Sequence, residues 1–117
     1  MAIITLTTDF GEKDYFAGAV KGAIYTELEQ QVRIVDISHS VSPFHISEAA
    51  YIIRNAYNSF PKGSIHIIGI DSEFTPENKH LAVLLDDHYF ICANNRLSHS
   101  VASEITPGKI VDVHIVD

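Results

Sequence analysis

The sequence predicts an α/β fold, a layered sandwich with a mostly parallel central sheet flanked by helices. Two observations predict it. Short apolar runs alternate with segments of helical periodicity, in the order β-α-β-α-β, then a hairpin, then α-β. The first strands are apolar on both faces, which is typical of parallel strands covered by helices on both sides. The 117 residues form one domain or part of one, and folding is expected to bury about two-thirds of the surface.

The first strand and helix are predicted within residues 2–28. Ala2 to Thr7 is apolar and β-branched, as in a buried strand. A helix is expected from Asp14 to about Leu28, with Asp14 as its N-cap or as an acid in its first turn. Its apolar residues recur every fourth position: Phe16, Val20, Ile24 and Leu28.

The middle of the chain repeats this strand and helix order. Val32 to Ile37 is the second predicted strand, and Ile46 to Asn58 is the second helix. Proline and glycine in Phe60 to Gly63 predict a turn, and Ser64 to Ile70 forms the third strand.

The last part of the chain is predicted to begin with a hairpin. Its strands are His80 to Leu85 and His88 to Cys92, joined at Asp86-Asp87. A short helix over Leu97 to Glu104 and a final strand over Lys109 to Val116 follow.

Composition excludes several classes of function. Eight basic residues against fifteen acidic ones give a net charge of −7, which disfavours nucleic-acid binding. A single cysteine, Cys92, excludes an internal disulfide and a Cys-based zinc site. No apolar run approaches the ~20 residues of a membrane span. The N-terminal residues lack the pattern of a signal peptide, so we expect a cytoplasmic protein.

Polar side chains follow four of the predicted strands. They are Asp9, then Asp36 with His39, then Asp71, and finally Asn94 with Asn95. Ligands bind beyond the carboxyl ends of parallel strands, so these groups are expected to share one rim of the sheet. Such a rim suits a polar small molecule with hydroxyl groups and an amine.

Each of these residues also has a structural interpretation. In this interpretation Asp9 only forms a turn, since Asp hydrogen-bonds to nearby backbone. Asp36 begins a loop or makes a hydrogen bond in the core. Asp71 caps a helix or lies on a surface loop, and Asn94-Asn95 supplies unusual backbone angles.

The histidines and the common motifs give little evidence of other chemistry. Seven histidines are present, none at a spacing typical of metal ligands, and we expect no metal site. Four lie in predicted strands and are expected to be ordinary strand-face residues: His66, His80, His88 and His114. Only His39, three residues after Asp36, is expected to join a site. Dinucleotide, P-loop and nucleophile-elbow glycine motifs are missing from the sequence.

Four segments of the chain match a known pattern, in order and over nearly its whole length. They are residues 4–11 with Asp14 and Gly18-x-x-Lys21-Gly22, residues 34–39 with Pro43 and Ala49-Ala50, residues 60–66, and Asn94-Asn95 before Leu97. Together they resemble the S-adenosyl-L-methionine hydroxide adenosyltransferase family, which includes S-adenosylmethionine-dependent chlorinases and fluorinases. The resemblance implies a trimer of two-domain subunits. Residues 1–117 would then be most of the N-terminal α/β domain, without the C-terminal β domain.

The resemblance also implies a reaction and a set of site residues. Water or halide displaces methionine at the 5′ carbon of S-adenosylmethionine, and no cofactor takes part. Asp9 matches the residue that holds the ribose hydroxyls, and Phe44 matches an aromatic residue against the substrate. Phe10, Asn94 and Asn95 complete the expected substrate-binding set. Asp71 matches an acid that activates water in the hydrolases and that the halogenases lack.

The chain departs from the family pattern in two places. In the loop that begins at Asp71, Asn78 replaces an arginine and the Pro-Gly-Val-Gly stretch is missing. Arg96 stands where the family has glycine. The histidine that completes the water-activating set would lie beyond residue 117, so we expect no turnover from this chain alone.

Three hypotheses follow. The chain belongs to an S-adenosylmethionine hydrolase, or it is a binding module for adenosine or S-adenosylmethionine without chemistry. The third hypothesis is a metal-dependent hydrolase built on four residues: Asp9, Asp36, His39 and Asp71.

Overall fold

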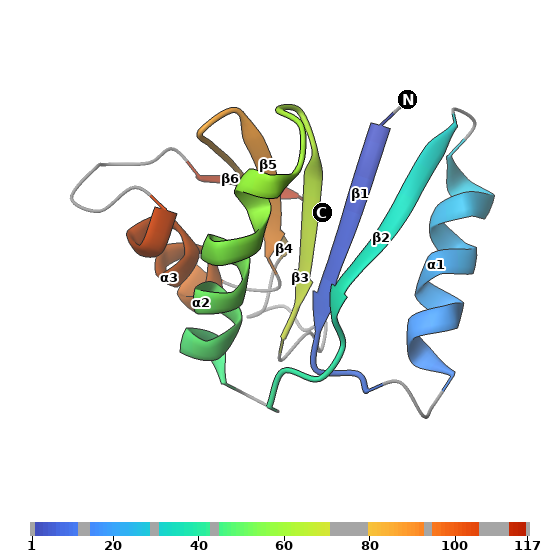
Figure 1. Cartoon of the computed structure of the whole chain (residues 1–117), viewed down its shortest axis with the longest axis horizontal. Helices are drawn as coiled ribbons and strands as arrows, with labels where there is room; N and C mark the ends of the chain where they lie inside the picture. Colours follow the sequence, from blue (N-terminus) through green and yellow to red (C-terminus); the bar gives the residue numbers. More distant parts are fainter. Residues whose placement is uncertain are drawn as a thin grey trace.

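The computed structural model has a single six-stranded sheet with helices on both sides (Figure 1). It describes residues 2–11, 15–28, 31–42, 45–70, 80–92, 95–105 and 113–116. The strands are β1 (Ala2–Thr8), β2 (Val32–Ser38), β3 (Ile65–Gly69), β4 (His80–Leu85), β5 (His88–Cys92) and β6 (Val113–Val116). Their spatial order is β2-β1-β3-β5-β4-β6. The predicted α/β sandwich is therefore confirmed.

The first four strands along the sheet are parallel, β4 runs against them, and β6 runs in their direction again. β1 pairs in parallel with β2 and with β3, and β3 pairs in parallel with β5. β4 is antiparallel to both β5 and β6. The β4–β5 hairpin turns at Asp86 and Asp87, whose φ angles of 49° and 62° match a two-residue turn of the I′ type. The predicted hairpin and its bounds are confirmed.

Three helices and one short 3-10 turn complete the described fold. They are α1 (Phe16–Glu27), α2 (Ile46–Ala56), the 3-10 turn η1 (Tyr57–Ser59) and α3 (Asn95–Ile105). The prediction for Asp14 was wrong, because Tyr15 occupies the N-cap of α1 and no acid lies in its first turn. None of these helices is long and apolar enough to cross a membrane.

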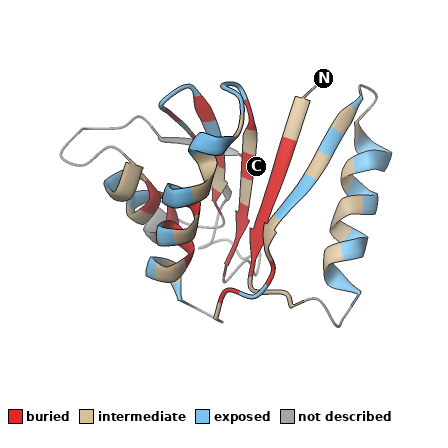
Figure 2. Ribbon diagram, in the orientation of Figure 1, coloured by how far each residue is buried: buried red, intermediate tan, exposed pale blue. Residues whose placement is uncertain are grey.

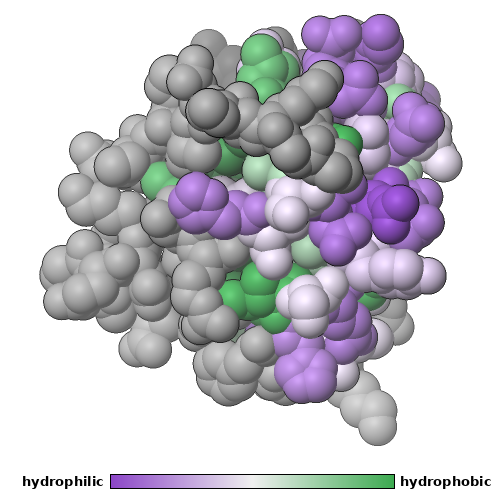
Figure 3. All heavy atoms as spheres, turned by 90° about the vertical axis from the view of Figure 1, so that its left-hand side faces the viewer, coloured by the Kyte–Doolittle hydropathy of each residue, from purple (hydrophilic) through white to green (hydrophobic). Residues whose placement is uncertain are grey.

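The sheet face under α2 and α3 carries the hydrophobic core. It includes Ile53, Ile68, Phe90, Leu97 and Val101, all almost fully buried. Figure 2 shows buried residues along the central strands and on the inner sides of these two helices. Seen from the side of α2 and α3, the surface of the described residues is mainly hydrophilic, with small apolar areas (Figure 3). Burial of this face supplies the main driving force for folding.

The opposite sheet face is less completely covered. α1 has no buried residue, and Phe16, predicted to lie on its apolar stripe, is 46% exposed. A groove of about 390 Å³ separates the helix from the sheet. Its lining is Ile4, Ala23, Ile24, Glu27, Leu28, Ile65, Ile67 and Ile91. Three of the four stripe residues, Val20, Ile24 and Leu28, are half-buried, so the predicted face is turned inward but only loosely packed on the sheet.

Candidate functional site

Parallel pairing brings the carboxyl ends of four strands to one rim of the sheet. Asp9 directly follows β1, and His39 directly follows β2. β3 and β5 end at the same rim because both run parallel to β1. Asn95 begins α3 just beyond β5. The strand ends therefore meet at one rim, with Asp9 and His39 directly after neighbouring strands. Asp36, also predicted there, lies within β2, and the predicted place of Asp71 is outside the described residues.

Some predicted site residues fall outside the described part of the chain. These are Phe44, Asp71 and Asn94, together with Asn78 of the loop after Asp71. Their predicted roles therefore remain predictions.

A tight turn carries Asp9 past the end of β1. Gly11 has a φ of +77°, a left-handed conformation that glycine adopts at low cost. Its amide donates a hydrogen bond of 2.7 Å to the carbonyl of His39. The Val41 amide donates to the carbonyl of Thr8 at 3.3 Å, and the Phe10 amide donates to Thr8 Oγ1 at 3.2 Å. The Thr8–Gly11 turn is thus bonded to the segment after β2 on both sides of Asp9.

The Phe10 side chain packs across the end of β3. A Cβ atom added to Gly69 would lie 3.4 Å from Phe10 Cζ and 3.4 Å from Thr8 Cγ2. The Phe10 ring therefore lies over Gly69, at van der Waals distance from where a side chain would begin. The ring also lies 6.1 Å, between centroids, from Phe16. Phe10 is half-buried and holds the turn against the sheet rather than standing free of it.

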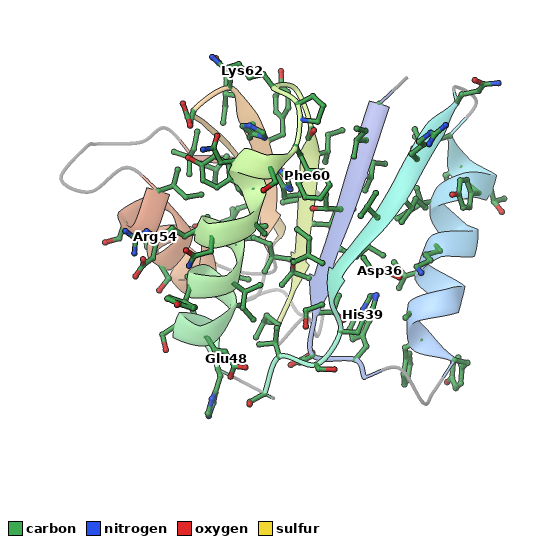
Figure 4. All side chains as sticks on the ribbon, viewed as in Figure 1. Asp36, His39, Glu48, Arg54, Phe60 and Lys62 are labelled. Carbon is green, nitrogen blue, oxygen red and sulfur yellow. The ribbon has the colours of Figure 1, made fainter. Side chains whose placement is uncertain are left out.

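A chain of hydrogen bonds connects this turn to the surface of α1. Thr8 Oγ1 lies 2.6 Å from His39 Nδ1. His39 Nε2 lies 2.7 Å from Asp36 Oδ1, and Lys21 Nζ bonds to Asp36 Oδ2. Figure 4 shows Asp36 and His39 together between β2 and α1. Since a carboxylate only accepts hydrogen bonds, His39 Nε2 carries the proton and donates to Asp36.

The charge on Asp36 is stabilised by its two partners. Desolvation alone would raise the pKa of this carboxyl, but the hydrogen bonds from Lys21 and His39 outweigh it and lower the pKa below its ordinary value of 3.8. Asp36 is therefore ionised over the whole physiological pH range. It acts as a fixed negative charge that orients the almost fully buried His39 ring.

The structure decides between the two interpretations of Asp36. It lies within β2 rather than in a loop, and it bonds to Lys21 of α1 and to His39 at a partly exposed position rather than in the core. Sequence reasoning paired Asp36 with His39 correctly but missed Thr8 and Lys21. The available signals were the position of Thr8 at the strand end and the Gly18-x-x-Lys21-Gly22 segment.

The described residues do not support the metal-dependent hydrolase. Within the described ranges, no group of three His, Cys, Asp or Glu side chains is placed to hold a metal ion. Both ring nitrogens of His39 already bond to Thr8 and Asp36. The remaining proposed ligand, Asp71, lies outside the described residues.

A second histidine network lies nearer the amino ends of the strands. Thr5 Oγ1 is 2.6 Å from His66 Nδ1, and His66 Nε2 is 3.0 Å from His88 Nδ1. Aromatic rings pack around the pair: Tyr57, Phe60 and Phe90. Desolvation, with a smaller contribution from His88, lowers the pKa of His66 to about 4. The strand-face prediction for these two histidines is confirmed, but their pairing was not foreseen.

Comparison with known proteins decides the family. Residues 4–116 match the model of the SAM hydroxide adenosyltransferase N-terminal domain. The chain belongs to this family. Its sequence is 35% identical, over 115 residues, to an (R)-S-adenosyl-L-methionine hydrolase from Methanocaldococcus jannaschii, covering 95% of this chain and 43% of that protein. A second (R)-S-adenosyl-L-methionine hydrolase, from Salinispora tropica, is 24% identical over 102 residues, covering 87% of this chain and 38% of that protein.

Solved structures share the fold of this SAM hydroxide adenosyltransferase domain. A conserved protein from Thermotoga maritima superimposes with a TM-score of 0.81 at 24% identity, covering 97% of this chain and 43% of that one. A conserved hypothetical protein from Thermus thermophilus gives a TM-score of 0.79 at 20% identity, covering 100% of this chain and 47% of that one. The chain therefore spans less than half the length of the relatives that it matches.

Proposed function

We propose that this chain is the nucleoside-binding part of an S-adenosyl-L-methionine hydrolase that releases adenosine and methionine. The observation that carries the proposal is the 35% identity to an (R)-S-adenosyl-L-methionine hydrolase over nearly the whole chain. The site geometry supports it, because Asp9 lies in an ordered turn at the rim where parallel sheets bind ligands.

The proposed reaction is a displacement at the 5′ carbon. A water oxygen forms a bond to that carbon while the carbon–sulfur bond breaks, and its electron pair leaves with methionine sulfur. The sulfonium charge is neutralised in this step, so the leaving group needs no proton. The water loses one proton to a base, and no cofactor is required. The protein therefore has to align the water with the carbon–sulfur bond and keep bulk solvent out.

The residues of this chain have separate tasks in the proposal. Asp9 accepts hydrogen bonds from the two ribose hydroxyls, which is strong because the acceptor is charged. Phe10, Phe44, Asn94 and Asn95 complete the nucleoside site. Asp71 takes the water proton, and its presence favours water over halide as the nucleophile. These assignments come from the family resemblance.

Calorimetry with adenosine tests the nucleoside site. We expect the chain to bind adenosine and Asp9→Ala to bind it about tenfold or more weakly, because a hydrogen bond to a charged group contributes about 1.5–3 kcal/mol. Asp87→Ala, which removes an exposed acid at the β4–β5 turn, is the matched control and should bind normally. Equal binding by Asp9→Ala would contradict the assignment.

A product assay separates the hydrolase from the binding module. We expect a protein of the relatives' full length that contains these residues to form adenosine and methionine in equal amounts from S-adenosylmethionine. The 117 residues alone should form neither, because the family's site is completed by a second domain. If the chain alone forms adenosine, and Asp9→Ala and Asp71→Asn each abolish it, the division of the site between domains is wrong.

The proposal extends to assembly and location. We infer a small-molecule substrate, a trimeric assembly and a cytoplasmic protein that binds neither nucleic acid nor membranes. The net charge of −7 supports the absence of nucleic-acid binding. The apolar groove beside α1 and the exposed Leu84 and Tyr89 support a covered sheet face in the assembled protein.

A further inference from the structure

The Thr8–Gly11 turn carries the residue that the proposed function assigns to the ribose, yet only one of its residues lies in a strand. Thr8 ends β1, and the remaining three follow it. Four residues held by two backbone hydrogen bonds leave considerable conformational freedom, and fixing each residue costs about 1–2 kcal/mol in entropy. A substrate hydroxyl requires the carboxylate at a defined place, so something must order this turn before the ligand arrives.

The side chains around Thr8 supply that order. Thr8 Oγ1 accepts the Phe10 amide hydrogen bond, and its hydroxyl proton can then point to His39 Nδ1, 2.6 Å away. His39 Nε2 donates to Asp36, and Lys21 donates to the other oxygen of the same carboxylate. Thr8 and His39 therefore have partners for all of their side-chain polar atoms in one arrangement of the turn.

Burial and charge make this arrangement stiff. Thr8 and His39 are 1% and 2% exposed, so a misplaced ring or hydroxyl would leave a buried polar atom without a partner. Asp36 and Lys21 fix the far side of the ring with a charged pair. The backbone of His39 contributes as well, because its carbonyl accepts the Gly11 amide. One residue therefore holds the turn at Thr8 and at Gly11, on either side of Asp9.

We propose that His39 is a positioning residue, which through Thr8 and Gly11 holds the turn in the conformation that presents Asp9 to the ribose hydroxyls of the substrate. The inference rests on the proposed function, and it adds a task for Thr8, His39, Asp36 and Lys21. His39 does not touch the substrate in this account. Its effect is on the recognition of hydroxyl groups rather than on overall folding.

The chain offers a matched pair of variants for the test. Thr8→Val removes the contact to His39, and Thr5→Val removes a contact of the same 2.6 Å length to His66 on the same strand. Valine keeps the shape of threonine, and both positions are buried. Thr8→Ser keeps the hydroxyl and should restore the function of the turn.

Two measurements on the 117-residue chain decide the question. The first is binding of adenosine and of 2′,3′-dideoxyadenosine, which lacks the ribose hydroxyls. We expect Thr8→Val to weaken adenosine binding about tenfold, the loss of one hydrogen bond to a charged group, and to change dideoxyadenosine binding less than about twofold. Thr8→Ser and Thr5→Val should both bind adenosine as the unmodified chain does. A uniform loss for both ligands, or an equal loss in Thr5→Val, would overturn the inference.

The second measurement is hydrogen exchange at the Gly11 amide, which needs no ligand. We expect exchange to become at least about tenfold faster in Thr8→Val and to stay unchanged in Thr5→Val after correction for global stability. If the unmodified chain does not prefer adenosine to dideoxyadenosine, the proposed function fails. The exchange rates then decide the inference alone, and unchanged Gly11 exchange in Thr8→Val would overturn it.

Discussion

Two networks on β1 begin with the same contact and end differently. At Thr8 a hydroxyl meets His39 at 2.6 Å, and the ring continues to a carboxylate and a lysine. At Thr5 a hydroxyl meets His66 at 2.6 Å, and the ring continues to a second histidine among aromatic side chains. The first network lies at the carboxyl ends of the strands, where ligands bind, and the second lies nearer the amino ends.

The difference shows that the role of each buried histidine depends on the partner of its second ring nitrogen, which is Asp36 for His39 and His88 for His66. Asp36 orients the His39 ring by charge, and a fixed ring can order a turn. His66 is fully buried without a carboxylate bonded to its ring, so the charged form is strongly disfavoured. We call the first group, Thr8, His39, Asp36 and Lys21, the Thr8 network and assign it to the site. The second group, Thr5, His66 and His88, is the Thr5 network, and we assign it to the stability of the core.

The largest expected effect is the pH dependence of the Thr5 network. The pKa of His66 is about 4 in the folded chain against an ordinary 6.5, so the unfolded chain binds a proton that the folded chain excludes. The contribution of His66 to stability should be fully present above about pH 6.5 and lost as the pH falls from 6.5 to 4. The loss is about 3 kcal/mol at most, and this contribution changes little below about pH 4. Urea unfolding between pH 7 and 4 measures this.

The control for that experiment removes the titrating ring. His66→Phe fits among the aromatic neighbours and should reduce the slope of the stability curve between pH 6.5 and 4. A smaller slope remains, because desolvation also lowers the pKa of His88. A curve that keeps its slope in this variant would show that other groups cause the acid sensitivity.

The next effect concerns the Thr8 network at lower pH. The pKa of Asp36 is lowered in the folded chain, so its stabilising contribution is complete above the ordinary value of 3.8 and is lost as the pH falls through the folded value. Asp36→Asn should cost about 1 kcal/mol or less at pH 7, because the carboxylate is partly exposed. The variant should also lose stability less steeply below pH 4 than the unmodified chain, in the same urea titration.

The smallest effect is expected at the outer end of the Thr8 network. Lys21→Met keeps the length of the side chain and removes its charge. In the ion pair between Lys21 and Asp36, each side chain is about one-third exposed. The free energy of unfolding should fall by less than about 0.5 kcal/mol, and high salt should remove most of the difference. A loss above about 2 kcal/mol that persists at high salt would mean that Lys21 is more deeply coupled to the turn than proposed.

Local pattern predicted most of the fold. Every described strand lies where an apolar run predicted one, and the β4–β5 hairpin has the predicted bounds, because strand period and turn residues are local properties. The position of α1 could not be predicted in the same way. Spacing shows which helix residues share a face, but not how closely the helix packs, and Phe16 remains exposed.

The candidate site was only partly readable from the sequence. Strand ends correctly placed Asp9 and His39 at one rim. The partners of His39 depend on long-range pairing, since Thr8 is 31 positions away, and no local pattern encodes that distance. The same holds for His66 and His88, which lie on paired strands and meet only through the sheet register. Contacts of this kind between side chains on different strands can be predicted only once the strand order and register of the sheet are known.

The most direct test of the account is to map adenosine binding on the ¹⁵N-labelled chain by NMR. The account predicts that adenosine shifts the amide signals of Asp9, Phe10 and Gly11, together with those of His39 to Val41, the segment that bonds to Gly11 and Thr8. The signals of His66 and His88 should stay in place, because their network lies nearer the opposite ends of the strands. Shifts concentrated around His66 and His88, with none in the Thr8–Gly11 turn, would contradict the central claim that this turn is the nucleoside site.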